Sequence, residues 1–410
     1  MHDISPFAHR DFRLLLLGRT TSQFGAQVSG VVIPLLAVLV LHASAFQLGV
    51  VNAAGTAAFA LIGLPAGAWI DRWRRRRVLV SSDTFRAAVL STVPLAWWLG
   101  ILTIWQLIMV SALVGVARVF FDVAYQSYIP TAIGTDRVLV GNSLMESIRA
   151  FGQVLGPGLS GWLVAIAGAA NVVLIQAGTF AVSAVSLLSI RVHEPKPVLD
   201  PDRPRLRIQI TDGLLFVVGN PVLRAMAITS SASNFGFAIA SAVTFIFMNG
   251  TLGLSPTAIG FVLALGSITV MVGAALTPKL AGHLGSARII WLALAVTGPI
   301  TLLGPLAQPG RLVALIIVGT AAGELGQIVY AVTSVSLRQR VCPEHMLGRV
   351  NATMRVLVLS LFPLGAVIGG VLGELIGLRG TLWLALGISC VSPTSVYLAL
   401  RQIRDVSQIR

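Results

Sequence analysis

Ionisable side chains inside long apolar segments are the residues of this chain whose types could do chemistry. Glu324 stands near the middle of such a segment, and Gln327, three residues further on, shares its helix face. A carboxylate held away from water favours its protonated form, so it can exchange protons or attract a cation. We predict proton coupling or cation recognition at Glu324. The alternative is a purely structural ion pair with an arginine.

A second group of charges occupies apolar segments of the first half. Asp122 is the second predicted proton-coupling residue, although Arg118, four residues earlier on the same helix face, offers it a structural partner instead. Arg19 lies roughly two turns into the first apolar segment, where it could contact an anionic substrate or one of these acids. Asp83 and Arg86 are predicted to be structural.

The segments that hold these charges are predicted to be membrane-spanning helices. Hydrophobic residues make up 56% of the 410 residues and charged residues only 11%, whereas soluble proteins carry roughly 25% charged residues. A lipid bilayer is therefore the expected solvent. Runs long enough to cross a bilayer core of about 30 Å recur at residues 12–41, 46–70, 78–100, 104–126, 143–167, 171–190, 222–248, 255–277, 287–306, 312–337, 347–376 and 380–400. The predicted fold class is an all-α membrane protein of twelve transmembrane helices.

The net charge of +14 lies in short arginine-rich clusters between the apolar runs, a distribution that argues against a nucleic-acid partner. Placing both termini in the cytoplasm puts most of the 29 basic residues on cytoplasmic loops, as membrane proteins prefer. This topology requires an even number of helices.

The two halves of the chain also resemble each other. Ser22-Gln23-Phe24-Gly25 is echoed by Ser233-Asn234-Phe235-Gly236, at an offset close to half the chain length. A duplicated six-helix unit is a common transporter plan. We predict an N-terminal bundle at residues 1–190, a cytoplasmic linker with a short surface helix at 191–221, and a C-terminal bundle at 222–410. Together they would form two six-helix pseudo-symmetric bundles.

The loop after the second predicted helix carries a motif with a recognisable pattern. It places a glycine four residues before Asp-Arg and follows them with a basic cluster. This pattern resembles the loop signature of the major facilitator superfamily, although Arg74 replaces a glycine of that signature. The resemblance implies a conformational latch formed by Gly67, Asp71, Arg72, Arg75 and Arg76. The alternative is that the cluster only anchors the topology.

The fifth predicted helix carries small residues at four-residue spacing around a proline. Gly152, Gly156, Pro157 and Gly161 resemble the packing motif of antiporters in this superfamily, with Ser160 at a position where glycine is usual. Such a seam lets helices approach closely. The resemblance favours export, whereas the residues alone fit a generic packing face.

The stretch from Phe121 to Pro130 resembles the macrolide- and siderophore-exporter branch of the superfamily, the drug:proton antiporter-3 group. The resemblance implies a secondary active transporter of the bacterial inner membrane that exports a drug, macrolide or siderophore-like compound, with a role in drug resistance or siderophore export. It would exchange protons and work as a monomer. The alternative is a nutrient importer or proton symporter of the same superfamily.

In this superfamily the first, fourth, seventh and tenth helices line the central cavity. The resemblance therefore assigns a substrate-cavity role to Arg19, Gln23, Phe24, Gln27, Asn234, Phe235 and Gln327. Packing is the alternative for the amides and their aromatic neighbours. The sequence contains no metalloprotease, hydrolase or nucleotide-binding motif, so we expect no enzyme, no cofactor and no metal site.

Overall fold

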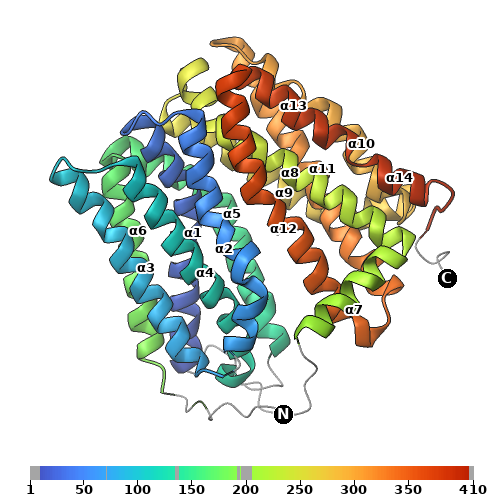
Figure 1. Ribbon diagram of the computed structural model, residues 1–410, viewed down its shortest axis with the longest axis horizontal. Helices are drawn as coiled ribbons and strands as arrows, with labels where there is room; N and C mark the ends of the chain where they lie inside the picture. The colour runs from blue at the N-terminus through green and yellow to red at the C-terminus, as the bar shows by residue number, and fades with distance from the viewer. Residues whose placement is uncertain (1–9, 71, 134–137, 192–193, 195–205, 406–410) are drawn as a thin grey trace. The chain divides into compact units, whose positions relative to one another are not determined.

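The computed structural model describes residues 10–70, 72–133, 138–191, 194 and 206–405, which form helices joined by short connections (Figure 1). The first half contains α1 (Arg10–Leu39), α2 (Ala45–Ile70), α3 (Arg75–Trp98), α4 (Ile104–Ile133), α5 (Val138–Ala167) and α6 (Ala169–Leu188). The second half contains α7 (Leu206–Gly219), α8 (Pro221–Ile246), the π-helix η3 (Phe247–Thr251), α9 (Pro256–Leu284), α10 (Arg288–Thr301), the 3-10 turns η4 (Gly304–Leu306) and η5 (Arg311–Val313), α11 (Ala314–Val341), α12 (Glu344–Leu375), α13 (Gly377–Val391) and α14 (Thr394–Leu400).

The predicted twelve-helix membrane fold is confirmed within the described part of the chain. Eleven segments are long and apolar enough to cross a bilayer, with α13 and α14 forming one of them. The twelfth is α3, which has 24 residues but carries Asp83 and Arg86. Both side chains are buried and form an ion pair with each other. This pairing makes the two charges tolerable at membrane depth.

Local sequence signals set several helix ends in the second half. The Asn220 side chain accepts hydrogen bonds from the backbone N–H groups of Val222 and Leu223, and Pro221 opens α8. Ser255 caps α9 in the same way, ahead of a proline. Such caps satisfy backbone donors that a helix start leaves free. Gly285 ends α9 with a φ of 97°, which only glycine adopts readily.

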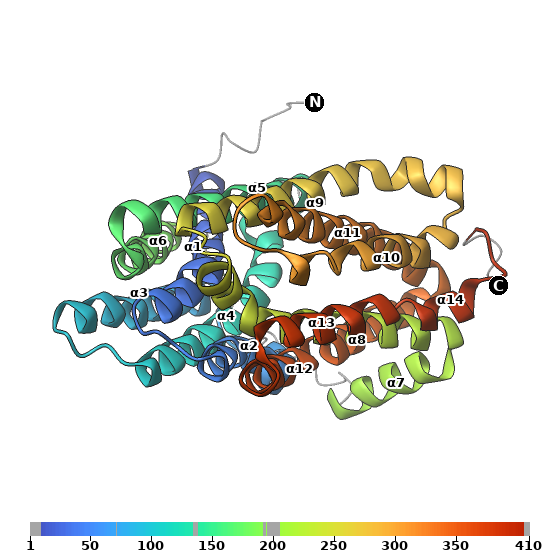
Figure 2. The same cartoon turned by 90° about the horizontal axis from the view of Figure 1, so that it is seen from above.

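Contacts group the chain into two units, Met1–His42 with Ala54–Asp202, and Ala43–Ala53 with Arg203–Arg410. In the first unit α1 packs against α5 and α6, and α3 packs against α4 and α6. In the second unit α8 packs against α12 and α13, and α11 packs against α9 and α10. Figure 2 shows α9, α10 and α11 as one layer of this unit, and α8, α12 and α13 as the other.

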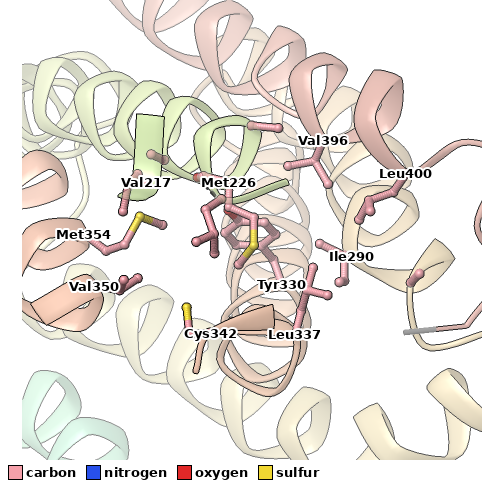
Figure 3. Packing of buried hydrophobic residues seen from close by; sticks show 14 of the residues in the cluster. Val217, Met226, Ile290, Tyr330, Leu337, Cys342, Val350, Met354, Val396 and Leu400 are labelled. Carbon is pink, nitrogen blue, oxygen red and sulfur yellow. Dashed lines mark hydrogen bonds between the residues drawn. The ribbon is translucent and has the colours of Figure 1, made fainter. Parts of the chain in front are cut away.

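A buried cluster holds α11 in place within the second unit (Figure 3). Val217 of α7, Met226 of α8, Val350 of α12 and Leu400 of α14 surround Tyr330 of α11. The Tyr330 hydroxyl lies 3.2 Å from the backbone oxygen of Met226, to which it donates. Since Tyr330 is less than two turns from Glu324, this cluster also fixes the helix that carries the carboxylate.

Candidate functional site: a cavity in the second unit

A cavity of about 280 Å³ lies inside the second unit, between its two layers of helices. Its walls come from α8, α9, α10, α11 and α13, with η3 and η4 contributing at one end. Most lining side chains are apolar or small, including Phe237, Met248, Leu263, Ile316 and Leu386. Mostly apolar walls with a few polar groups are typical of small-molecule sites.

Glu324 is the one charged side chain among the described residues that line this cavity. It is half-buried and packs across Gly266 of α9, where an added Cβ would lie 3.5 Å from the Glu324 Cγ. No described arginine, lysine or histidine forms an ion pair with it. The structural ion pair considered from the sequence is therefore not formed within the described residues.

This environment decides what the carboxylate can do. An unpaired charge near the centre of a membrane helix costs about 2.5–3.5 kcal/mol on insertion scales. Either a bound proton or a cationic ligand beside the carboxylate would remove that cost. Gln327 lines the same cavity and is exposed, so it can donate to or accept from a ligand beside the carboxylate.

Hydroxyl groups on the cavity wall were not predicted from the sequence. Thr297 and Thr301 of α10 line the cavity, as do Ser233 and Ser389. Thr297 and Thr301 donate to carbonyl oxygens of their own helix, at 2.9 and 2.6 Å. Because their protons are used locally, these groups face the cavity as weak acceptors. The four-residue spacing of the two threonines was the available signal, but such spacing is common in membrane helices.

The first unit brings Arg19 and Asp122 together. Arg19 Nη1 lies 3.9 Å from Asp122 Oδ1, and Arg118 Nε lies 3.7 Å from Asp122 Oδ2. The Arg19 guanidinium also stands over the Tyr125 ring, 4.6 Å from its centroid. Asp122 is thus shared between two arginines, whereas Glu324 has no ion-pair partner among the described residues.

Asp83 and Arg86 form a second charge pair, deeper in the first unit. The Asp83 carboxylate accepts from Arg86 and from the hydroxyl of Ser183 on α6. The Arg86 guanidinium lies between two rings, 4.5 Å from the centroid of Phe121 and 4.4 Å from that of Phe180. Arg86 is 2% exposed and Asp83 fully buried, so this group joins α3, α4 and α6 away from solvent.

The predicted packing seam on α5 faces α1. Gly152, Gly156 and Gly161 are buried, and Pro157 lies inside the helix. The side chain of Gln27 rests on Gly156, where an added Cβ would be 2.6 Å from the Gln27 Cβ. Gln23 lies against Gly152 in the same way. Glycine at these positions allows α1 and α5 to approach closely.

A methyl group at Gly156 should therefore destabilise the protein. We expect Gly156→Ala to cost about 1–3 kcal/mol through overpacking against Gln27, seen as a lower melting temperature in detergent. Gly178→Ala on α6 is the matched control, since nothing lies within 4 Å of the position of its added Cβ. That variant should be neutral or slightly stabilising. Equal melting temperatures for the two variants would contradict close packing of α1 against α5 at Gly156.

The other residues predicted to line the substrate cavity lie elsewhere in the two units. Asn234 of α8 donates from Nδ2 to the backbone oxygen of Val358 on α12, at 2.7 Å. Phe235 lies against Gly365 of α12, where an added Cβ would be 3.1 Å from its ring. Phe24 of α1 is half-buried. None of these three is among the described residues that line the second-unit cavity.

The latch residues surround the start of α3. Asp71 lies outside the described residues. Gly67 is on the last turns of α2, and Arg72 follows that helix with an exposed side chain. Arg75 and Arg76 begin α3, and their backbone N–H groups donate to the carboxylate of Glu194 at 2.6 and 3.0 Å. No feature of the sequence indicated that Glu194, distant along the chain, would cap α3.

A polytopic helical protein with a lone carboxylate on an internal cavity has the construction of a secondary transporter. The model of the Major Facilitator Superfamily matches residues 15–363, and the chain belongs to this superfamily. It is therefore a multi-pass membrane transporter and not an enzyme. Within the described residues no group of three or more His, Cys, Asp or Glu side chains is placed to hold a metal ion.

Several characterised proteins are similar along nearly the whole chain. The multidrug efflux pump Tap of Mycolicibacterium fortuitum is 30% identical, with 96% of each chain covered. The enterobactin exporter EntS of Shigella boydii is 27% identical, covering 90% of this chain and 86% of its own. Among solved structures, a bacterial homologue of the iron transporter ferroportin superposes with a TM-score of 0.77 at 17% identity, covering 95% of this chain and 98% of that one. The nucleoside transporter NupG gives a TM-score of 0.74 at 13% identity, covering 98% and 100%. These two structures share the fold.

Proposed function

We propose that this transporter exports a small, largely apolar organic compound in exchange for protons. The observation that carries the proposal is Glu324 on an apolar cavity, without an ion-pair partner among the described residues. The similarity to a multidrug efflux pump and to an enterobactin exporter supports the direction of transport and the class of drug-like or siderophore-like substrate.

One carboxylate can couple the two movements by alternate occupancy. When Glu324 is protonated, the cavity is neutral and offers little attraction to a cationic or strongly polar ligand. When it is ionised, a cationic or hydrogen-bond-donating group of a bound substrate stabilises the charge. The proton stabilises the neutral cavity, and the substrate stabilises the ionised one. The two therefore compete for the Glu324 carboxylate. Competition of this kind produces exchange of substrate for proton.

We further propose that both termini lie in the cytoplasm of a bacterial cell, with the protein in the inner membrane. The arginine cluster from Arg72 to Arg77 would then lie on the cytoplasmic side, as positive residues in short loops do. In this orientation, export moves substrate from the side of the membrane on which the arginine cluster lies to the opposite side.

Accumulation in whole cells tests the direction of transport. A bacterial strain lacking its main efflux pumps, with and without this protein, is loaded with ethidium, erythromycin or tetracycline, and enterobactin in the medium is measured in parallel. We expect expression to lower the intracellular level of at least one drug, or to raise extracellular enterobactin, several-fold. A nutrient importer, the alternative, would leave all four unchanged, and that result would overturn the proposal of export.

A further inference from the structure

The basic end of the first unit carries a groove that the transport cycle proposed above does not use. It has a volume of about 730 Å³ and runs between α3 and α4. The guanidinium groups of Arg72, Arg74 and Arg77 lie at one end, beside Trp73 and Phe120, and the apolar side chains of Phe85 and Val116 line the groove further along. We call it the α3–α4 groove.

The arginines of this groove have no anionic side-chain partner within the described residues. No acidic residue is among its described lining residues, and Arg72, Arg74 and Arg77 form no ion pair with a described residue. Arg76, by contrast, is occupied: its side chain donates to the backbone oxygens of Leu187 and Leu188, at 2.9 and 2.5 Å. The backbone N–H groups at the start of α3 are likewise occupied, by Glu194.

The chemistry of the groove changes along one face of α3. Arg77, Ser81 and Phe85 follow each other at four-residue spacing, so the same face passes from charged to hydroxyl to aromatic. From Arg74 to Phe85 the helix rises about 16 Å at roughly 1.5 Å per residue. Phe85 and Val116 are 43% and 37% exposed, which leaves the apolar part of the groove open along its length.

Aromatic residues place the basic end at the depth of lipid headgroups. Trp73 lines the groove and is half-exposed, and its ring centroid lies 6.0 Å from that of Phe120. Trp69 stacks on the same ring, also with a centroid distance of 6.0 Å. Tryptophan is enriched at the interface between headgroups and acyl chains. This pattern indicates that the arginines face the phosphate level of a bilayer and the apolar end its acyl chains.

We propose that the α3–α4 groove binds an anionic glycerophospholipid. Its phosphate would contact Arg72, Arg74 and Arg77, and one acyl chain would lie along Phe85, Val116 and Phe120. Basic pockets between transmembrane helices are suited to lipid headgroups of this charge. A zwitterionic lipid fits less well, because the groove offers no described acid for its ammonium group.

Native mass spectrometry of the full-length protein tests this site. Phosphatidylglycerol and phosphatidylcholine of equal chain length are added to the detergent-solubilised protein, and bound lipid is counted. We expect at least a ten-fold preference for phosphatidylglycerol in the wild type. Arg74→Gln with Arg77→Gln should abolish the preference. Arg340→Gln with Arg401→Gln, which removes two exposed arginines of the second unit, should retain it.

Two further arms separate a lipid groove from a general basic surface. Ser81→Trp fills the groove without changing its charge, and we expect the preference to fall to that of the arginine variant. Inorganic phosphate added at the concentration of the lipid should not displace phosphatidylglycerol. Retention of the preference by Ser81→Trp, retention by the Arg74 and Arg77 variant, or displacement by inorganic phosphate would each overturn the proposal. Melting temperatures in phosphatidylcholine confirm that the variants are folded.

Discussion

Glu324→Gln should abolish efflux driven by a pH gradient. The amide keeps the shape of the side chain and, like the protonated acid, is neutral and can both donate and accept, but it cannot release a proton, so the cavity stays in its neutral form throughout the cycle. The compound that wild-type protein removes from cells is loaded into proteoliposomes, and its exit is followed after a pH jump. We expect the gradient-dependent rate to fall about 100-fold or more, to the level of empty liposomes, which corresponds to at least about 2.8 kcal/mol at about 1.4 kcal/mol per decade.

The matched control is Glu374→Gln, an exposed carboxylate at the end of α12 in the same unit. Glu374 accepts a hydrogen bond from Ser44 at 2.6 Å, which an amide oxygen can also accept. This variant should keep the wild-type response to pH. Exchange of labelled for unlabelled substrate without a gradient then separates the two roles predicted for Glu324. Exchange that persists in Glu324→Gln indicates proton coupling, and its loss indicates substrate recognition. Full gradient-driven efflux by Glu324→Gln would contradict both.

Asp83→Asn should strongly destabilise the first unit. The substitution leaves the Arg86 guanidinium buried without its counter-charge, and breaking a buried ion pair in this way costs about 3–5 kcal/mol. The rings of Phe121 and Phe180 compensate only a small part of that charge, since a cation–π contact contributes about 0.5–2 kcal/mol. We expect little monodisperse protein in detergent and a large fall in melting temperature, both measured by size-exclusion chromatography after heating.

Removing both charges should restore much of the stability. Asp83→Leu with Arg86→Met replaces the pair by apolar side chains, and such replacements are often neutral or stabilising. Arg118→Met is the control for loss of a single arginine from the same unit. Its side chain is 55% exposed, so we expect a cost below about 1 kcal/mol. If Asp83→Asn melted at the temperature of Arg118→Met, the pair would not hold α3, α4 and α6 together.

The sequence predicted the fold almost completely, because hydropathy alone decides which segments cross a bilayer. Each of the twelve predicted segments overlaps a helix of the structure or, at the C-terminus, the pair α13 and α14. The exact ends of the helices were harder to predict. α3 starts at Arg75 rather than residue 78, since Glu194, far along the chain, caps its first turn. α10 ends at Thr301, five residues early, where Pro299 and Gly304 lead into a 3-10 turn.

The candidate site was predictable only where a charge marked it. Glu324 and Gln327 stood out as polar residues in an apolar helix, and both line the cavity. The wall that faces them comes from α8, α9, α10 and α13, and its identity depends on how those helices cross. A single sequence does not contain that geometry. For the same reason Gln23 and Gln27, polar residues on α1, could not be assigned from the sequence to the α5 seam on which they rest.

The sign of proton movement in wild-type proteoliposomes tests proton-coupled exchange most directly. A pH-sensitive dye is enclosed in the lumen, the compound identified in cells is added outside, and no gradient is imposed. Exchange predicts that each substrate molecule entering the lumen drives protons out, so the lumen becomes more alkaline, whichever way the protein is inserted. Glu324→Gln should give no signal. A lumen that turns acidic on substrate addition would mean that protons and substrate move together, and it would contradict the proposed antiport.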